Sequence, residues 1–301
     1  MQIAGAQTKI ALKNILYLTD FSEPSEAALP FATAFARAYG AKVYALHVFM
    51  PTPLPYTTPA ATMAALEAEE ECAQGAMRRV ESQLAGLSYE TAIERGIGVW
   101  ETVQQAMGGN RIDLVVLGTH GRTGAEKLLL GSVAEEIFRR SPVPVLTIGP
   151  GVRTSVHAAG RFHRVLFATD FTAESLAAAP FAVSLAQENA ARLVLMHVMR
   201  EPGQRNENEK KVFELSVAEA IHQLYEIVPK DVELSFPPEV AIEYGAPADC
   251  IVAAARQCGV DVIVLGVRDA ARRLGVATHL GRATAHKVVA HAPCPVLTVR
   301  G

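Results

Sequence analysis

Long apolar runs, abundant cysteine and an excess of basic residues are all missing from this sequence. The most apolar stretches are short, such as Asp113 to Gly118, far below the ~20 residues that span a bilayer, so we expect no membrane insertion. Lys and Arg number 28 against 31 Asp and Glu, which leaves no broad basic surface for sequence-independent nucleic-acid binding. The first residues, MQIAGAQTKIALKN, lack the apolar core and cleavage site of a secretory signal. We therefore expect a soluble, cytoplasmic protein without a nucleic-acid partner.

The four cysteines contain no CxxC pair, which is the spacing typical of structural metal or redox sites. They are Cys72, Cys250, Cys258 and Cys294. Cys250 and Cys258 stand eight residues apart in a predicted helix, about two turns, so both can share one face. We interpret the four as buried thiols of a reducing compartment, with a metal or redox site as the alternative.

The usual nucleotide and hydrolase motifs are also missing. No Gly-Lys dipeptide occurs, which excludes a P-loop of the GxxxxGK[ST] kind. Gly96 and Gly98 are followed by Glu101 where a dinucleotide-binding fingerprint needs a third glycine. GxSxG is absent, so a nucleophile elbow of the α/β-hydrolase type has no support.

An internal duplication is the most informative feature that is present. The chain has 301 residues, half of them hydrophobic and a fifth charged, which suits a folded protein of about two domains. Residues 14–49 match residues 164–199 without gaps at 14 of 36 positions. DLVVLG from Asp113 matches DVIVLG from Asp261, and PVPVLTI from Pro142 matches PCPVLTV from Pro293. We predict two copies of one domain, at residues 1–150 and 163–301, joined by a linker at 151–162.

Each copy alternates apolar runs with amphipathic helical stretches. The runs in the first half are continuous, as in strands buried on both faces of a parallel sheet, and the pattern predicts a doubly wound α/β domain of about five strands. Proline-rich residues 51–62 are not expected to form regular structure. The predicted strands are Ile15–Leu18, Val43–Phe49, Leu114–Leu117 and Val143–Ile148, and the predicted helices are Ser22–Tyr39, Thr62–Leu84, Val99–Met107 and Ser132–Arg140.

Three segments of the first half end strands where an open parallel sheet binds ligands. They are Leu18-Thr19-Asp20, His47-Val48 and the run GTHGRTGAEKLLLGSVAEEI that begins at Gly118. In that run two glycine elements, Gly118 with Gly121 and Gly131 with Ser132, stand where backbone N–H groups and a helix N-terminus can cradle an anion. We expect the Ser132 hydroxyl both to cap the helix and to donate to a phosphate oxygen. Ordinary turns are the alternative reading of these glycines.

Taken together, TDFSE after the first strand, HV at the end of the second, the Gly-2x-Gly-9x-Gly-Ser spacing and PVPVLTI resemble the universal stress protein family. The resemblance covers nearly the whole chain as two fused copies. It implies two tandem Rossmann-like α/β domains, similar to adenine nucleotide alpha hydrolases, each a five-stranded parallel sheet flanked by helices. ATP-binding members of that family use the glycine motif for ribose and phosphates, and the strand-1 aspartate and strand-2 valine for adenosine.

Position by position, the resemblance nominates a set of ATP-binding residues in the first half. Asp20 would bind the nucleoside, with Thr19 and Val48 as walls of the adenine pocket. A helix or turn cap is the alternative role of Asp20, and His47 and His197 are expected to be core histidines. The residues expected to contact ribose and phosphates are Gly118, His120, Gly121, Gly131, Ser132 and Val133.

The second half keeps Asp170 and Val198 but not the glycine pattern. Asp269 stands at the second glycine, eleven residues precede Gly281, and Arg282 replaces the serine. A carboxylate repels phosphates, whereas Arg268, Arg272, Arg273 and Arg282 could attract an anion or be solvated surface residues. We therefore predict one competent ATP site, in the first half.

The resulting hypothesis is an ATP-binding stress-response sensor or regulator, with Mg²⁺ held mainly by the phosphates. A slow ATPase or a nucleotidyl or phosphoryl transferase is the second hypothesis, since Arg122 and Lys127 are cations in the glycine loop, although no general base can be named. A protein-interaction module with vestigial pockets is the third. We expect the apolar terminal strands to form an intramolecular pseudo-dimer, with a homodimer and an unknown protein partner as further possibilities.

Overall fold

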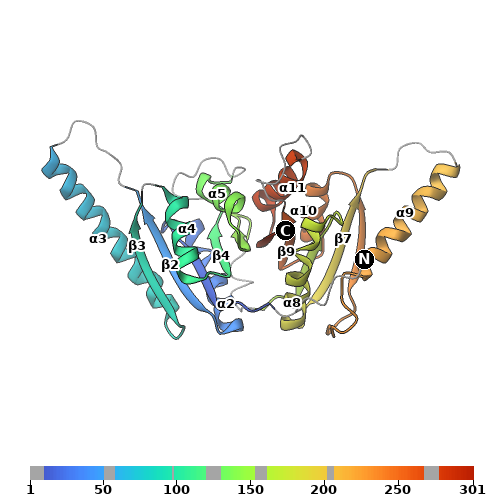
Figure 1. The fold of residues 1–301 in the computed structure, drawn as a ribbon, viewed down its shortest axis with the longest axis horizontal. Helices are drawn as coiled ribbons and strands as arrows, with labels where there is room; N and C mark the ends of the chain where they lie inside the picture. Colours follow the sequence, from blue (N-terminus) through green and yellow to red (C-terminus); the bar gives the residue numbers. More distant parts are fainter. Residues whose placement is uncertain are drawn as a thin grey trace. The chain divides into compact units, whose positions relative to one another are not determined.

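The computed structural model describes residues 10–50, 58–96, 98–119, 130–152, 161–201, 207–267 and 278–301. The chain divides into two compact units whose main spans are Leu12–Pro150 and Arg161–Gly301, here called the first and second domains. In Figure 1 the first domain runs from blue to light green and the second from yellow to red.

The first domain contains five strands and five helices among its described residues. Its strands are β1 (Asn14–Leu18), β2 (Lys42–Phe49), β3 (Tyr89–Arg95), β4 (Leu114–Gly118) and β5 (Val145–Ile148). Its helices are α1 (Glu23–Glu26), α2 (Leu29–Tyr39), α3 (Pro59–Leu84), α4 (Val99–Asn110) and α5 (Ser132–Arg140).

The described part of the second domain repeats this order. Its strands are β6 (Arg164–Ala168), β7 (Arg192–Met199), β8 (Glu239–Tyr244), β9 (Val262–Val267) and β10 (Val296–Arg300). Its helices are α7 (Ala173–Leu176), α8 (Ala179–Asn189), α9 (Glu207–Tyr225), α10 (Pro247–Gln257) and α11 (Thr278–His291).

The strand order is β3-β2-β1-β4-β5 in the first domain and β8-β7-β6-β9-β10 in the second. Within each domain the paired strands are parallel. The order reverses between β1 and β4, and between β6 and β9, which is the switch point where doubly wound sheets bind ligands. The predicted fold of two tandem α/β domains, each with a five-stranded parallel sheet, is confirmed.

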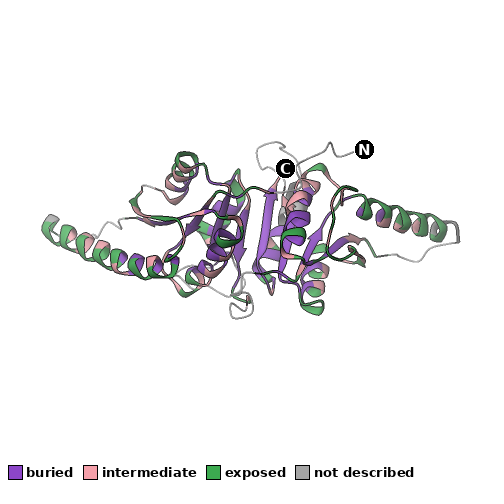
Figure 2. Ribbon diagram, turned by 90° about the horizontal axis from the view of Figure 1, so that it is seen from below, coloured by how far each residue is buried: buried purple, intermediate pink, exposed green. Residues whose placement is uncertain are grey.

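Burial explains which strands the sequence pattern revealed. The central strands β1 and β4 are almost wholly buried, as their continuous apolar runs predict, whereas β3 lies at the edge of its sheet and is mostly exposed or half-buried. In Figure 2 the buried strands inside the sheet are purple, whereas the exposed side of helix α3 is green. The run YETAIER of β3 therefore carries too few apolar residues to be recognised as a strand by hydrophobicity alone.

Prolines account for most of the differences between predicted and observed elements. The prediction of one helix over Ser22–Tyr39 is wrong, because this segment forms two helices, α1 and α2. Pro30, near the start of α2, has no N–H group and cannot continue the hydrogen-bond ladder of α1. Strand β5 begins at Val145 rather than Val143, directly after Pro144. Helix α3 begins earlier than expected because Thr58 accepts a hydrogen bond from the N–H of Ala61, so the last residues of the proline-rich segment are helical.

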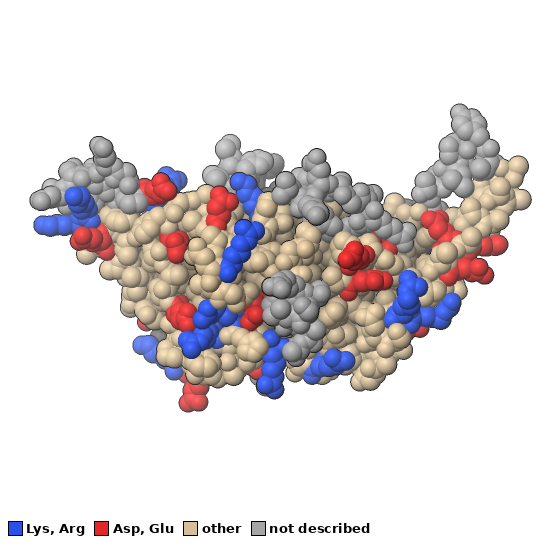
Figure 3. All heavy atoms as spheres, turned by 180° about the vertical axis from the view of Figure 1, so that it is seen from behind, with Lys and Arg blue, Asp and Glu red and all other residues tan. Residues whose placement is uncertain are grey.

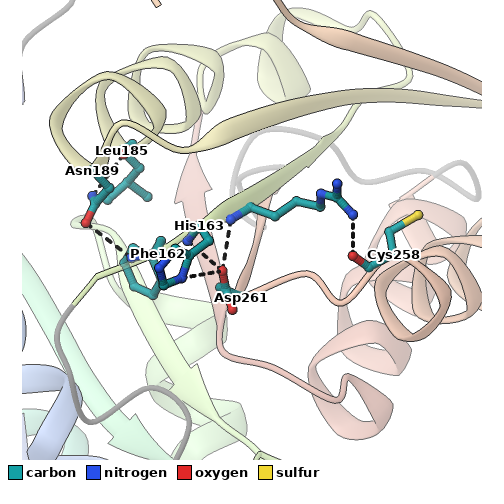
Figure 4. Close-up of polar contacts among 7 residues, drawn as sticks. Phe162, His163, Leu185, Asn189, Cys258 and Asp261 are labelled. Carbon is teal, nitrogen blue, oxygen red and sulfur yellow. Dashed lines mark hydrogen bonds and ion pairs between the residues drawn. The ribbon is translucent and has the colours of Figure 1, made fainter. Parts of the chain in front are cut away.

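One aspartate in each domain holds the start of the first strand. Asp113 Oδ2 accepts hydrogen bonds from the backbone N–H groups of Lys13 and Asn14, at 2.7 and 2.9 Å. Asp261 Oδ2 does the same for His163 and Arg164, at 2.6 and 2.9 Å (Figure 4). The shared Asp-Val/Leu start of the DLVVLG and DVIVLG runs is thus a structural feature that joins β1 to β4 and β6 to β9.

The cysteines are less buried than expected. Cys294 is buried, and burial raises the pKa of its thiol to about 12. Cys250 is half-buried, and Cys72 and Cys258 are exposed, so the interpretation of four buried thiols is wrong for three of them. The expectation that Cys250 and Cys258 share one helix face fails at Cys258, which is the C-terminal cap of α10 and follows its last helical residue.

The described helices include none that is long and apolar enough to cross a membrane. On the face seen in Figure 3, Lys and Arg side chains are interspersed with Asp and Glu side chains rather than gathered in one field.

Candidate functional site

A cavity of about 280 Å³ opens at the carboxyl ends of β1, β2 and β4 in the first domain. It lies at the switch point of the sheet, and the starts of α4 and α5 complete its wall. The residues that line it are Leu18, Thr19, Asp20, Ser25, Leu46, Val48, Val99, Leu117, Gly118, Thr119, Gly131, Ser132, Val133 and Ala134.

The cavity brings together seven of the nine residues predicted from the sequence. They are Thr19, Asp20, Val48, Gly118, Gly131, Ser132 and Val133. The other two, His120 and Gly121, lie outside the described residues, as do Arg122 and Lys127. Residues from three strand ends and one helix start, far apart in the sequence, thus face one space.

Asp20 forms a tight turn at the mouth of the cavity. Its Oδ1 accepts hydrogen bonds from the backbone N–H of Ser22 at 3.0 Å and from the Ser22 hydroxyl at 2.5 Å. Between them Phe21 adopts φ +60°, a left-handed conformation that costs a residue with a side chain of the order of 1 kcal/mol or more. Asp20 is therefore both a turn-forming residue and a carboxylate at the cavity, so the two roles weighed for it are compatible.

His47 supports this strained turn from the neighbouring strand. Its Nδ1 lies 2.8 Å from the carbonyl oxygen of Thr19, and since a carbonyl only accepts, Nδ1 carries the hydrogen. The imidazole also packs against the Phe21 ring, tilted by 37° with centroids 4.4 Å apart. His47 is buried, as expected of a core histidine, and His197 makes the same two contacts in the second domain while half-buried.

Gly118 is required first by packing. A Cβ at this position would lie 2.4 Å from the carbonyl oxygen of Pro24 and 3.0 Å from the backbone nitrogen of Ser25. Helix α1 therefore sits directly on the end of β4, and Tyr17 holds it there by donating its hydroxyl to the Ser25 carbonyl at 2.9 Å. Burial raises the pKa of Tyr17 to about 12, which keeps this donor protonated. Gly118 lines the cavity, but a phosphate is not needed to explain it.

Helix α5 begins at the cavity, and its first backbone N–H groups have no acceptor within the helix. Gly131 is the N-terminal cap, with φ −60° and ψ 147°, and makes no side-chain cap hydrogen bond. The expectation that Ser132 caps the helix is therefore wrong, because Ser132 is already the first helical residue. The first helical bond runs from Glu135 N–H to the Gly131 carbonyl at 2.8 Å, which leaves the N–H groups of residues 132–134 without an intrahelical acceptor.

Much of the cavity lining is apolar. It includes Leu46, Val48, Val99 and Leu117, and of these only Val48 was predicted. Val99 is the first residue of α4 and follows Gly98, the N-terminal cap of that helix. The Gly96–Gly98 pair was a signal that this segment turns tightly at a strand end, although the sequence could not show that it faces β2. One cavity thus has apolar walls, a carboxylate and a helix N-terminus.

The second domain has a smaller cavity, of about 130 Å³, at the equivalent switch point. Asp170 repeats the turn, since its Oδ1 accepts from the N–H and hydroxyl of Thr172 at 3.1 and 2.5 Å, and Phe171 has φ +60°. The lining residues are Ala168, Thr169, Asp170, Thr172, Ser175, Met196, Val198, Pro247, Ile251, Leu265, Gly266, Thr284 and Ala285.

The helix beside this second cavity begins differently. The strands PVPVLTI and PCPVLTV are 151 residues apart, and at that spacing the buried Ala134, Ile137 and Phe138 of α5 match the buried residues Ala285, Val288 and Val289 of α11. Ser132 therefore corresponds to Ala283, one residue later than the match with Arg282 that the sequence suggested. Helix α11 begins at Thr278, five residues before Ala283. Backbone N–H groups at 283–285 are thus inside a helix, where they bond to the preceding turn.

The prediction that the second domain has no ATP site was based partly on residues that the structure does not describe. Asp269, Arg268, Arg272 and Arg273 lie outside the described residues, and α11 is described as helix at Gly281 and Arg282 without their side chains. Among the residues that are described, no group of three or more His, Cys, Asp or Glu could hold a metal ion.

These features define the class of protein: two tandem doubly wound α/β domains, each with a cavity at its switch point. A family model described as the universal stress protein family matches residues 11–149 and again residues 161–300. The chain belongs to the universal stress protein family, which confirms the resemblance seen in the sequence.

Individual relatives agree with this assignment. Universal stress protein MJ0531 of Methanocaldococcus jannaschii is 34% identical over 141 residues, which cover 45% of this chain and 81% of that protein. A universal stress protein of Thermus aquaticus is 32% identical over 139 residues, 45% of this chain and 98% of the relative. The crystal structure of a universal stress protein from Archaeoglobus fulgidus covers 95% of this chain and 98% of its own, with a TM-score of 0.67 and 24% identity. The last match shows that the tandem fold is shared.

Proposed function

We propose that this protein binds ATP in the cavity of its first domain and acts as a nucleotide-dependent sensor or regulator in a stress response. The observation that carries the proposal is the combination of chemistries that lines that one cavity. Apolar side chains, a carboxylate and a helix N-terminus all face a space of about 280 Å³. An adenine ring, a ribose with its hydroxyl donors and a phosphate chain require the same three environments.

Each end of the nucleotide has a physical partner among the described residues. Leu46, Val48 and Val99 supply the apolar walls that a base needs. Asp20 is placed to accept hydrogen bonds from hydroxyl or amino groups, because its Oδ1 is held in the turn by Ser22. The N–H groups of residues 132–134 and the macrodipole of α5 favour an anion. We further propose that His120 and Gly121 extend this phosphate site.

Mg²⁺ accompanies the triphosphate in this proposal. The described residues that line the cavity include one carboxylate, Asp20, and no other acidic side chain. Such a site suits a magnesium ion bound mainly through phosphate oxygens and water. The ion would neutralise phosphate charge, while the chain itself would hold and orient the nucleotide.

Calorimetric titration of the intact chain with ATP and Mg²⁺ tests the proposal. We expect one ATP per chain. Ser132→Pro should weaken binding about thirtyfold, because it removes one N–H and one hydroxyl, each worth about 1 kcal/mol in a hydrogen bond and about 2 kcal/mol together. Ser132→Ala, which removes the hydroxyl alone, is the matched control and should lose less. A chain that binds no ATP, or that binds two equivalent molecules, contradicts the proposal.

The slow-ATPase hypothesis rests on Arg122 and Lys127, which the structure does not describe. No described residue of the cavity is marked out as a general base, since Asp20 already serves the turn. Sustained phosphate release that disappears in Ser132→Pro would favour the enzyme. Persistence of that release in the variant would identify a contaminant.

A further inference from the structure

We infer that the cavity of the second domain is a separate ligand site that takes a nucleoside without phosphates. The inference rests on the proposed function for the chemistry of the nucleoside end. It concerns a site that the ATP proposal leaves unused. The second cavity keeps the aspartate turn, a valine from its second strand and apolar strand-end residues, and lacks the helix start that would hold phosphates.

The retained end is nearly identical in geometry. Asp170 occupies the same turn as Asp20, with the same pair of hydrogen bonds at Oδ1 and the same left-handed residue after it. Val198 and Leu265 line this cavity as Val48 and Leu117 line the first. The turn is therefore preserved in strained form in a domain whose phosphate motif has diverged, which is unexpected if nothing binds there.

Gly266 allows the same close packing of a helix on a strand end as its counterpart Gly118. A Cβ there would lie 2.3 Å from the carbonyl oxygen of Glu174 and 2.4 Å from the Cα of Ser175. Helix α7 thus sits on the end of β9 as α1 sits on β4. Thr169 and Ser175 share a hydroxyl hydrogen bond of 2.8 Å at the base of the cavity, where Thr19 and Ser25 share one of 3.1 Å.

The phosphate end differs in two respects. The extra turns of α11 place the N–H groups of residues 283–285 within the helical ladder, so they are not available to an anion. Thr284 lines the cavity at the position of Val133, and Asp170 is the one charged side chain among the described lining residues. Asp20 is likewise the one charged side chain among the described lining residues of the first cavity, so the helix start rather than the charge separates the two cavities. The Asp170 carboxylate suits a neutral ligand that donates hydrogen bonds.

Size points the same way. The second cavity has about 130 Å³ against about 280 Å³ for the first, so it has less room for a ligand. A nucleoside is the part of ATP that matches a carboxylate and apolar walls. Adenosine is therefore the probe of choice for this site.

Matched variants of the two aspartates allow a direct test. Asp20→Asn and Asp170→Asn both retain an Oδ1 that can accept from Ser22 or Thr172, so the turns persist while the carboxylate charge is removed. The intact chain is saturated with ATP and Mg²⁺ and then titrated with adenosine in a calorimeter. We expect one adenosine per chain, at least tenfold weaker binding in Asp170→Asn, and binding within twofold of the parent in Asp20→Asn.

Three results would overturn the inference: no adenosine binding by the ATP-saturated chain, loss of that binding in Asp20→Asn rather than Asp170→Asn, or a second ATP that adenosine displaces. Failure of the ATP proposal is seen separately, because the ATP titration precedes the adenosine titration. If ATP does not bind, the same two variants report on adenosine in its absence. Equal adenosine binding by the parent and both variants then contradicts the second site alone.

Discussion

The two domains differ most at the start of one helix. In the first domain α5 begins at Ser132, beside the cavity, whereas in the second α11 begins at Thr278, five residues before the equivalent position. The strands, the aspartate turns and the packing glycines are the same in both. Duplication has thus kept the framework while the position of a helix N-terminus changed, and that position decides whether backbone donors face the cavity.

A glycine that both domains retain is therefore not evidence of phosphate binding. Gly118 and Gly266 are both forced by the close approach of a helix to a strand end. Gly131, in contrast, marks the beginning of α5 and has no equivalent helix start in the second domain. Only the latter kind of glycine separates the two domains at the proposed phosphate site.

Proline substitution at the two equivalent positions should give the largest effect. Ala283→Pro places proline inside α11, where it removes a helical hydrogen bond and clashes with the preceding turn, at a cost of about 3 kcal/mol. Ser132→Pro places it at the first helical position, and the preceding Gly131 already has the extended φ and ψ that proline demands of its neighbour. We expect denaturant unfolding to show strong destabilisation of the second domain and almost none of the first.

Equal destabilisation by both prolines would contradict the difference in helix start. Ala283→Ser serves as the control, because it restores the residue of the first domain without affecting the backbone. It should cost less than about 1 kcal/mol, since serine is only moderately less favourable than alanine in a helix.

Alanine at the two packing glycines should give the next largest effect, and an equal one. Gly118→Ala and Gly266→Ala each add a Cβ closer than 3.0 Å to backbone atoms of α1 or α7. Overpacking of this kind costs about 1–3 kcal/mol. Thermal or denaturant unfolding measures it. Loss of nucleotide binding in Gly118→Ala with unchanged stability would show instead that this glycine serves the ligand.

Thiol labelling should give a smaller, local readout of the same comparison. Exposed Cys72 and Cys258 should react with a disulfide reagent in the folded protein, whereas Cys294 should react only when the second domain opens. Ala283→Pro should accelerate the labelling of Cys294, and Ser132→Pro should not. Mass spectrometry of the labelled peptides gives the rates. Rapid labelling of Cys294 in the unaltered chain would contradict its buried position.

The Cys294 pKa also predicts a pH dependence. Burial raises this pKa from its usual 9.0 to about 12 in the folded state, so the unfolded state loses the thiol proton first. The free energy of unfolding of the second domain should therefore fall as the pH rises above about 9 and level off above about 12. Cys294→Ala should reduce this dependence in a pH series of unfolding measurements. An unchanged pH profile would show that other groups cause it.

Much of the fold could be predicted because hydrophobic patterns and the duplication agreed. The central strands and helix Ser132–Arg140 follow from the sequence, since a strand buried on both faces and a helix with one apolar face have distinct periods. The division of residues 22–39 into α1 and α2 was missed because Pro30 can be read either inside a first turn or at a break. Strand β3 was missed because exposure at the edge of the sheet removes the apolar signal.

Local patterns and repetition in the sequence were enough to indicate the family, the two-domain order and the strand ends at which Asp20, Val48 and Gly118 would meet. Which backbone groups face each cavity depends on the tertiary structure. The start of a helix depends on how far its hydrogen-bond ladder extends towards the N-terminus. The five added residues of α11 follow a segment whose sequence gives no clear signal for where the helix begins. Close approach of α1 to β4, likewise, is a relation between distant residues that no local pattern records.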